Sequence, residues 1–505
     1  MLKSNAIAND QPGIENPPSS PAASQHESES SAMVDFAPGL ESAFPSEFPE
    51  YDSRLECIQG NVPEFIDGIY YLNGPARFGM NDFRYQHWLD GDGMVCALRF
   101  DHGRVHLKSR YIQSNKYRAE SEACKPLFRA FGTTFPDSRL NSAHNGLESP
   151  VNVSVYPFHD CLLAFGEQGL PWELDPQTLE TRGEYNFNGR LNAASPFSAH
   201  PKFDVESGEM FNFGIFFSPQ TPKLYFYCFG REGLRYRKAV AIEYPCSVHD
   251  FALSKNYAVF YLSPYLLNLQ PLLKENATLM DSLSWQPERG SRLLVISRKS
   301  GELIASLPVG NRYCLHLINA FEQDKKLIVD LLEFDEPIYA EYEPVPHLFQ
   351  HVAVGGPVRF SIDTAKAELS HRISLDYRQA PDFPAIDTRQ AMRAYDDFWM
   401  LGISATGQPG RKFFDRLVHA NWNRLDHIDL YQSPRFRYLG GEPVFIADPG
   451  SSRGAILCQE FAVEERRSSF LLFDAHQVRK GPIARITGDL SLYLGFHATF
   501  QATAH

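Results

Sequence analysis

Ser198-Ala199-His200-Pro201-Lys202-Phe203-Asp204 places a histidine directly before a proline, between a strand and a turn. Pro201 removes one backbone N–H and restricts His200 to an extended conformation. Residues 204–209 then read as a turn, and residues 210–214 as a strand. The pattern predicts that a strand ends or bends here, with the imidazole projecting from its tip. A single histidine in this setting is weak support for a metal site, so the rest of the chain has to supply partners.

Short strand-like runs separated by turns continue through most of the 505 residues. Runs that alternate apolar and polar residues lie between Gly, Asp and Asn turns, for example in residues 94–100, 105–112, 223–227, 257–261 and 292–296. Aromatic residues, which favour strands, make up 13% of the chain. This pattern predicts an all-β sandwich, barrel or propeller. About 460 residues in seven units give about 65 each, which is enough for four strands and their loops, so a propeller fits best.

The composition limits the domain organisation and the partners. Residues 1–45 are rich in Ser, Pro, Ala, Asn and Glu, which predicts a disordered N-terminal tail, and residues 46–505 are predicted to form one domain. The net charge of −13 argues against nucleic acid. No secretory signal and no run of about 18 apolar residues is apparent. Eight dispersed cysteines are typical of buried free thiols in a reducing compartment, so a cytoplasmic protein is expected. No obligate protein partner is evident.

One loop departs from the β pattern because leucines cluster in it. The loop is predicted to be partly helical, and two interpretations stay open: a packed loop, or an apolar patch that contacts a membrane surface or admits an apolar substrate. The residues of this patch would be Tyr265, Leu266, Leu267, Leu269, Leu272 and Leu273.

Four of the 17 histidines stand where a turn meets a strand-like run: His200, His249, His316 and His497. Their separations of 49, 67 and 181 residues exclude a local zinc finger or a pair on one helix. In a propeller, strands of different blades approach one axis, so these imidazoles are expected to meet there. Four imidazoles would hold iron, copper, zinc or nickel, with carboxylates expected to orient them.

The chain resembles the carotenoid cleavage oxygenases, a family that includes stilbene-cleaving oxygenases and the retinoid isomerohydrolase. The resemblance covers residues 55–500. It rests on ordered motifs: NGP (73–75), HWLDGDGM (87–94), LAFGE (163–167), LPWELDP (170–176), SAHPKFD (198–204), HDF (249–251), His316 with Asn319, GEPVF (441–445) and GFH (495–497).

The resemblance implies a seven-bladed propeller, with a few helical loops over one face and one Fe(II) on its axis, held by His200, His249, His316 and His497. It also implies that carboxylates orient three of these ligands, and Glu167 and Glu442 match two of the positions. At the third, Asp382 stands where the family usually has glutamate, so its hydrogen bond is expected to need a water or a shifted backbone. Val153 is expected near the open iron position, where many members have threonine.

The implied function is a dioxygenase that uses O₂ to cleave one conjugated C=C bond of an apolar carotenoid or apocarotenoid, giving two aldehydes. Central cleavage of an apocarotenoid to a retinal-like product is preferred. Stilbene-cleaving members tend to hold the phenol with a tyrosine and a lysine, and no lysine occurs between Lys125 and Lys202. Stilbene cleavage, non-oxidative isomerisation of a carotenoid or retinoid, and an inactive binding platform remain as alternatives.

Overall fold

The computed structural model describes residues 34–141, 146–338, 345 and 349–503. Residues 1–33 of the predicted tail lie outside the described residues. Val34–His505 form one compact unit. The predicted tail boundary at residue 45 is wrong, because the 3-10 helix η1 (Leu40–Ala43) and Phe44 belong to the folded unit. Leu40 and Phe44 are buried, and the Phe44 ring packs edge-on against Phe78 and Trp88, so these apolar side chains order a segment with a tail-like composition.

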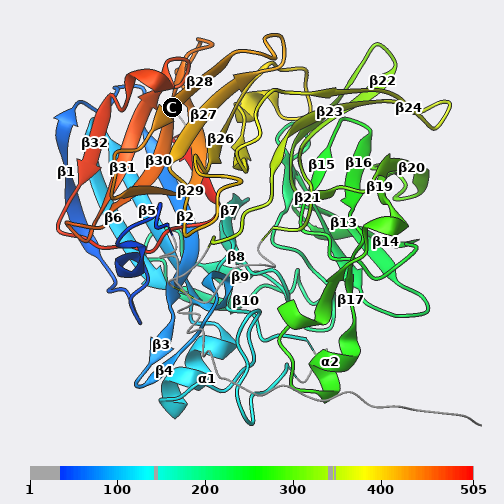
Figure 1. Ribbon diagram of the computed structural model, residues 1–505, viewed down its shortest axis with the longest axis horizontal. Helices are drawn as coiled ribbons and strands as arrows, with labels where there is room; N and C mark the ends of the chain where they lie inside the picture. Colours follow the sequence, from blue (N-terminus) through cyan, green and yellow to red (C-terminus); the bar gives the residue numbers. More distant parts are fainter. Residues whose placement is uncertain (1–33, 142–145, 339–344, 346–348, 504–505) are drawn as a thin grey trace, which may run out of the picture. The chain divides into compact units, whose positions relative to one another are not determined.

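Five four-stranded antiparallel sheets follow one another along the chain, and Figure 1 shows them in order from cyan through green to yellow and orange. In each sheet, neighbouring strands are neighbours in sequence or are separated by a loop insertion. The sheets are β7 (Ser154–Phe158), β8 (Cys161–Phe165), β9 (Trp172–Leu174), β10 (Thr181–Glu184); β11 (Lys202–Asp204), β12 (Glu209–Phe216), β13 (Lys223–Gly230), β14 (Gly233–Ala241); β15 (Phe251–Leu253), β16 (Tyr257–Leu262), β19 (Ser291–Ser297), β20 (Leu303–Gly310); β21 (Tyr313–Gln323), β22 (Lys326–Phe334), β23 (Gly355–Asp363), β24 (Glu368–Ser374); and β25 (Asp382–Ala385), β26 (Asp397–Gly402), β27 (Arg416–Asn421), β28 (Ile428–Gln432).

A nine-stranded sheet joins the two ends of the chain and supplies two further blades. Its order is β29 (Arg437–Ala447), β30 (Gly454–Ala462), β31 (Arg467–Asp474), β32 (Ala484–Thr487), β1 (Asp52–Gly60), β6 (Arg104–Tyr111), β5 (Asp92–Asp101), β2 (Gly68–Arg77), β33 (Ala498–Ala502). The outer strands β32 and β1 pair where the two blades meet, and β33 pairs with β2 and closes the ring. With the five four-stranded sheets, the described residues therefore form the predicted seven-bladed propeller.

The first strands of the blades line the centre of the ring. Strand β7 contacts β2 and β33, β21 contacts β15 and β25, and β29 contacts β25 and β33. The core lies between the blades, where apolar faces of successive sheets pack together. Outer strands are polar instead: β24 has no buried residue. Exposed charged side chains on outer strands protect an open sheet edge against pairing with another chain.

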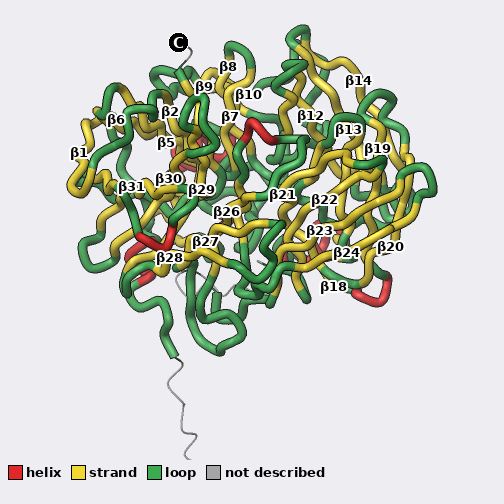
Figure 2. The backbone as a smooth tube through the Cα atoms, turned by 90° about the horizontal axis from the view of Figure 1, so that it is seen from above, coloured by secondary structure: helices red, strands yellow, loops and turns green. Residues whose placement is uncertain are grey.

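Helices are few and short, and Figure 2 shows them as small red segments among yellow strands. The helices are α1 (Asn115–Ala123) and α2 (Leu269–Lys274). The 3-10 helices besides η1 are η2 (Trp88–Asp90), η3 (Met280–Ser282), η4 (Pro287–Arg289), η5 (Thr388–Gln390) and η6 (Val478–Lys480). Two small hairpins complete the described structure: β3 (Gly79–Met80) with β4 (Phe83–Arg84), and β17 (Tyr265–Leu267) with β18 (Leu283–Trp285). No helix in the described part of the chain is long and apolar enough to cross a membrane.

The leucine-rich loop is partly helical, as predicted, and of its two interpretations the burial of its side chains supports the packed loop. Tyr265, Leu266, Leu267 and Leu272 are buried, Leu269 is half-buried, and only Leu273 is largely exposed. The leucines face inward because this loop packs on a second one: the backbone N–H of Met280 donates to Phe131 O. In Figure 1, α1 and α2 lie on the same side of the propeller, as expected for loops that cover one face.

The eight cysteines are free thiols, of which five are buried. Cys57 and Cys124 are exposed and Cys161 is half-buried, so the prediction of buried thiols is wrong for these three.

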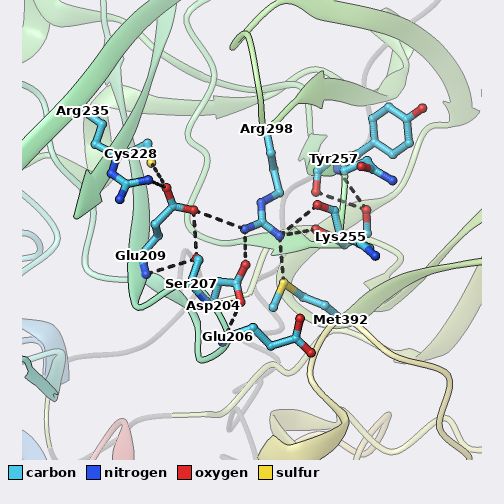
Figure 3. A network of polar contacts seen from close by, with 12 residues as sticks. Asp204, Glu206, Ser207, Glu209, Cys228, Arg235, Lys255, Tyr257, Arg298 and Met392 are labelled. Carbon is cyan, nitrogen blue, oxygen red and sulfur yellow. Dashed lines mark hydrogen bonds and ion pairs between the residues drawn. The ribbon is translucent and has the colours of Figure 1, made fainter. Parts of the chain in front are cut away.

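A buried arginine ties together the turns of neighbouring blades. Arg298, directly after β19, donates to Oδ2 of Asp204 (2.6 Å), the last residue of β11, and to the carbonyl of Ser254 (2.8 Å), the residue after β15. Its guanidinium also contacts Met392 Sδ at 3.1 Å, and Figure 3 shows how these groups converge on it. Because Asp204 lies four residues after His200, this network fixes the far end of the strand that follows this histidine.

Candidate metal centre

The four histidines singled out in the sequence occupy equivalent places in four blades. His200 precedes β11, His249 precedes β15, His497 precedes β33, and His316 lies near the start of β21. The register of β21 against β22 shifts between Cys314 and Leu317, which is a bulge around His316. Bulges re-aim side chains, and strand starts around one axis face a common centre. The structure therefore brings together residues almost 300 positions apart in sequence.

The four imidazoles form one compact cluster. One nitrogen from each ring lies within 4.8 Å of one nitrogen from every other ring. The ring centroids are 4.2 Å apart for His200 and His249, 4.4 Å for His200 and His497, and 5.0 Å for His316 and His497. Three rings are buried and the His249 ring is half-buried. Such a nitrogen-only set suits a borderline divalent metal ion.

Each of three imidazoles has a carboxylate as a hydrogen-bond partner at Nδ1. Glu167 Oε1 lies 3.0 Å from His249 Nδ1, and Glu442 Oε2 lies 3.2 Å from His497 Nδ1. Asp382 Oδ1 lies 2.5 Å from His316 Nδ1. An Nδ1–H held by a carboxylate leaves Nε2 as the free electron-pair donor. The carboxylates thereby select the tautomer that a metal ion requires.

Asp382 reaches its histidine directly although its side chain is short. The sequence left two ways for this short side chain to reach His316, a bridging water or a shifted backbone. The structure shows a shifted backbone. The pairing of β25 with β26 shifts between Asp382 and Ala385, and Phe383 adopts a positive φ of 51°. Positive φ is uncommon for a bulky residue, so this bulge is a local distortion next to the site.

The protonation states favour neutral rings at two positions. Burial and the neighbouring His249 lower the pKa of His200 well below its usual value. Burial also lowers the pKa of His497, against the opposing effect of Glu442. For His249 burial acts in the same direction, but the carboxylates of Glu167, Asp250 and Asp382 together outweigh it and raise the pKa. Nε2 of His200 and Nε2 of His316 are buried and have no hydrogen-bond partner in the structure. Buried polar atoms are normally paired, so these two are free to take a ligand.

One aspartate that was not predicted from the sequence connects three of the histidine strands. Asp250, which follows His249, accepts the backbone N–H of Leu317 at Oδ2 (2.9 Å). Its Oδ1 lies 2.7 Å from Lys202 Nζ and 4.0 Å from His200 Nδ1. Burial opposes ionisation of Asp250, but Lys202, His316 and the Leu317 N–H together outweigh it and lower the pKa. The sequence does hold one indication of this role, because Lys202 and Asp250 stand within two residues of His200 and His249.

The backbone of Val153 lies next to the backbone of His497. The backbone N–H of His497 donates to Val153 O at 3.1 Å, and Val153 is buried. An aliphatic side chain here offers no hydrogen bond to a neighbouring ligand. That this side chain stands near the open iron position, as the resemblance implies, stays a prediction.

Aromatic rings surround the cluster on one side. The Phe383 centroid lies 5.2 Å from that of His497 and 5.8 Å from that of His316, and Phe414 and Phe349 continue the group. Trp88 packs 4.6 Å from Phe496, the residue before His497. The histidine cluster therefore borders an apolar, aromatic environment.

Gly441 sets the position of Glu442, and replacing it with alanine is expected to weaken metal binding. Gly441 has φ 71°, and an added Cβ would lie 3.0 Å from Leu72 Cδ1. Left-handed backbone costs a non-glycine residue about 1–2 kcal/mol. The Glu442 N–H donates to Phe496 O at 2.6 Å, so relief of the strain would move Glu442 away from His497. The test measures Fe(II) affinity and Tm of the purified variant.

Gly407→Ala is the matched control, because Gly407 has φ 79° and an added Cβ would have no atom within 4 Å. This variant should lower Tm by a similar amount and leave Fe(II) affinity unchanged. Equal Fe(II) affinities in both variants would contradict the role of Gly441.

Comparisons with known proteins identify the family. A family model described as "Retinal pigment epithelial membrane protein" matches residues 43–502. Isoeugenol monooxygenase of Pseudomonas putida is 28% identical over 479 residues, covering 91% of this chain and 96% of that protein. Apocarotenoid-15,15′-oxygenase of Synechocystis is 26% identical over 457 residues, covering 88% and 92%.

A solved structure of cobalt-substituted Synechocystis ACO matches with a TM-score of 0.83 at 24% identity, over 92% of this chain and 98% of that one. At this identity the match supports the propeller fold. The family model spans most of the chain. The alignments with the two oxygenases cover more than nine tenths of their length. The chain therefore belongs to the retinal pigment epithelial membrane protein family, the carotenoid cleavage oxygenases that its motifs resemble, and is an oxygenase.

Proposed function

We propose that this chain is a non-haem Fe(II) dioxygenase. It cleaves a C=C bond that is conjugated to a polyene or an aromatic ring and yields two carbonyl products. The observation that supports this most is the cluster of four imidazoles, two of which have buried Nε2 atoms without a partner. His200, His249, His316 and His497 would hold one iron ion per chain. Bound Fe(II) would supply the redox chemistry by which O₂ reacts with an alkene, since four ligands leave positions open on a six-coordinate ion.

The protein residues have roles that do not depend on that chemistry. Glu167, Asp382 and Glu442 keep a proton on Nδ1 of their histidines and orient the rings. Lys202 balances the charge of Asp250, so this carboxylate can hold the backbone next to His316. The phenylalanine rings around the cluster exclude water and present an apolar surface to a substrate without charged groups.

The overall reaction balances without a further reductant. One alkene and one O₂ give two carbonyl compounds: the C=C and O–O bonds break, and each carbon receives one oxygen atom. No proton or electron is gained or lost in this sum. An isomerisation would consume no O₂, and a binding platform would consume nothing.

Two substrate classes fit this reaction. A carotenoid or apocarotenoid is the first, as the sequence motifs imply. An aryl alkene is the second, and a specific observation favours it: isoeugenol monooxygenases of two Pseudomonas species are 27% and 28% identical to this chain, against 26% for the apocarotenoid oxygenase. Isoeugenol is a phenol with a propenyl side chain, and stilbenes such as resveratrol belong to the same chemical class.

The test is an incubation of the Fe(II)-loaded protein under ¹⁸O₂ with β-carotene, an apocarotenal, isoeugenol and resveratrol. Products are identified by chromatography and mass spectrometry, with short reaction times to limit exchange of aldehyde oxygen with water. We expect aldehydes that carry ¹⁸O from one class. Geometric isomers without ¹⁸O would indicate an isomerase, and tight binding without turnover would indicate a binding platform; either result would overturn the proposal.

A further inference from the structure

A second group of metal-ligating side chains lies where the blade of β25–β28 meets the turn after β31. Asp397 is the first residue of β26, His419 lies in β27, and His476 lies in the turn between β31 and η6. One possible ligand atom from each of the three lies within 4.8 Å of those from the other two. The sequence alone gives no reason to connect the two histidines, because they are 57 positions apart and share no motif.

Two members of this group are already oriented. His419 Nε2 lies 2.8 Å from Asp397 Oδ1, which also accepts a hydrogen bond from Asn421 Nδ2 at 2.7 Å. The His419 ring stacks on Trp399, with centroids 5.2 Å apart and planes inclined by 15°. His419 is buried, whereas the Asp397 side chain is 31% exposed. The pair is thus fixed in place and accessible to an ion from solvent.

The third member is brought to this pair by a separate contact. Trp399 Nε1 donates to the carbonyl of Ala475 (2.7 Å), the residue before His476. The His476 ring lies 5.4 Å from the His419 ring and 5.9 Å from the Trp399 ring, measured between centroids. His476 is exposed, and its Nε2 has one long contact of 3.3 Å with Ser452 O. Its ring can therefore turn toward a cation with little loss.

A neighbouring carboxylate adds negative charge. Asp429 of β28 pairs directly with His419 of β27, so the two side chains share one face of the sheet. Asp429 is buried, and its Oδ2 has no hydrogen-bond partner in the structure. Arg479, which contacts Asp429 Oδ1, is the nearby opposing charge. Asp397 and Asp429 together outweigh this single arginine.

We propose that Asp397, His419 and His476 bind one divalent transition-metal ion, and that this site is separate from the four-histidine cluster. Two imidazoles and a carboxylate suit zinc, which takes a fourth ligand from water. Zinc would bind Nε2 of neutral His419, so the proton that Nε2 shares with Asp397 Oδ1 would be transferred through solvent to Nδ1 and Asp397 would turn its carboxylate to the ion. Asp382 pairs with Leu401 near one end of β26 and Asp397 begins the other, so the sites are about 13 Å apart along the strand. This inference does not rest on the proposed enzymatic function.

The test titrates Zn²⁺ into Fe(II)-loaded protein by anaerobic calorimetry, with Tm as a second measurement. We expect one additional Zn²⁺ per chain, and a rise in Tm because the ion would join β26 and β27 to the turn after β31. His476→Ala should weaken Zn²⁺ binding at least about tenfold and remove the rise in Tm. It should leave bound iron and turnover unchanged, because His476 does not contact the four-histidine cluster.

His371→Ala is the matched control, since His371 is exposed in β24 and belongs to neither group. It should keep the additional Zn²⁺. The proposal would be overturned if the natural chain bound no additional Zn²⁺, or if His476→Ala bound it as tightly as the control does.

Discussion

Replacing His316 with alanine is expected to abolish both iron binding and turnover. His316 is buried, its Nε2 has no partner, and its Nδ1 is held by Asp382. Alanine removes a metal-ligating nitrogen that no neighbouring group can replace. It also leaves the buried Asp382 carboxylate without its hydrogen bond to the imidazole. Iron content and product formation would both fall to background, measured by metal analysis and by product assay.

The control for this variant is His102→Ala, because the His102 side chain is 82% exposed and pairs only with Asp101 in a surface turn. It should keep full iron content and turnover. Circular dichroism and Tm show whether the His316 variant remains folded. A folded His316→Ala protein that retains iron and turnover would contradict the assignment of this residue as a ligand.

Replacing Asp382 with asparagine is expected to weaken Fe(II) binding by about 10–100-fold. The substitution keeps the shape of the side chain and removes the negative charge that holds Nδ1–H of His316 at 2.5 Å. Asp382 Oδ1 also accepts the Phe383 N–H at 2.8 Å, which an amide oxygen can still do. The bulge should therefore survive, and the loss would report on the imidazole. Fe(II) affinity is measured by anaerobic competition with a chelator.

Asp382→Glu tests the same contact from the other direction. It introduces the glutamate that the family usually has here and keeps the negative charge. This variant should therefore bind Fe(II) more tightly than Asp382→Asn. Asp376→Asn, at an exposed position, is the control for loss of a carboxylate and should have no effect. If asparagine and glutamate at residue 382 gave the same Fe(II) affinity as the natural chain, the carboxylate would have no role in orienting His316.

The sequence predicted the fold and the four histidines for identifiable reasons. Strands can be predicted locally, because apolar and polar side chains alternate between turn residues. About 460 residues with this pattern fit seven blades. His200 and His249 stood out because turns and strands meet at these residues. Glu167, Asp382 and Glu442 were selected through the family motifs, and the structure places each beside a different imidazole.

Features that depend on contacts between distant residues could not be predicted in this way. Phe44 is buried because Phe78 and Trp88 receive it, although its surroundings in sequence resemble a tail. Leu272 faces inward because another loop covers it. His419 and His476 look unrelated until β26, β27 and the turn after β31 are placed together. Only the folded chain reveals such neighbours.

One iron ion held by the four histidines is proposed to carry out the reaction. The most direct measurement titrates metal-free protein with Fe(II) under exclusion of air, then follows product formation on adding O₂ and the active substrate. Activity should be absent without iron, should rise linearly, and should stop rising at one Fe(II) per chain. Full activity in the metal-free protein would contradict the claim.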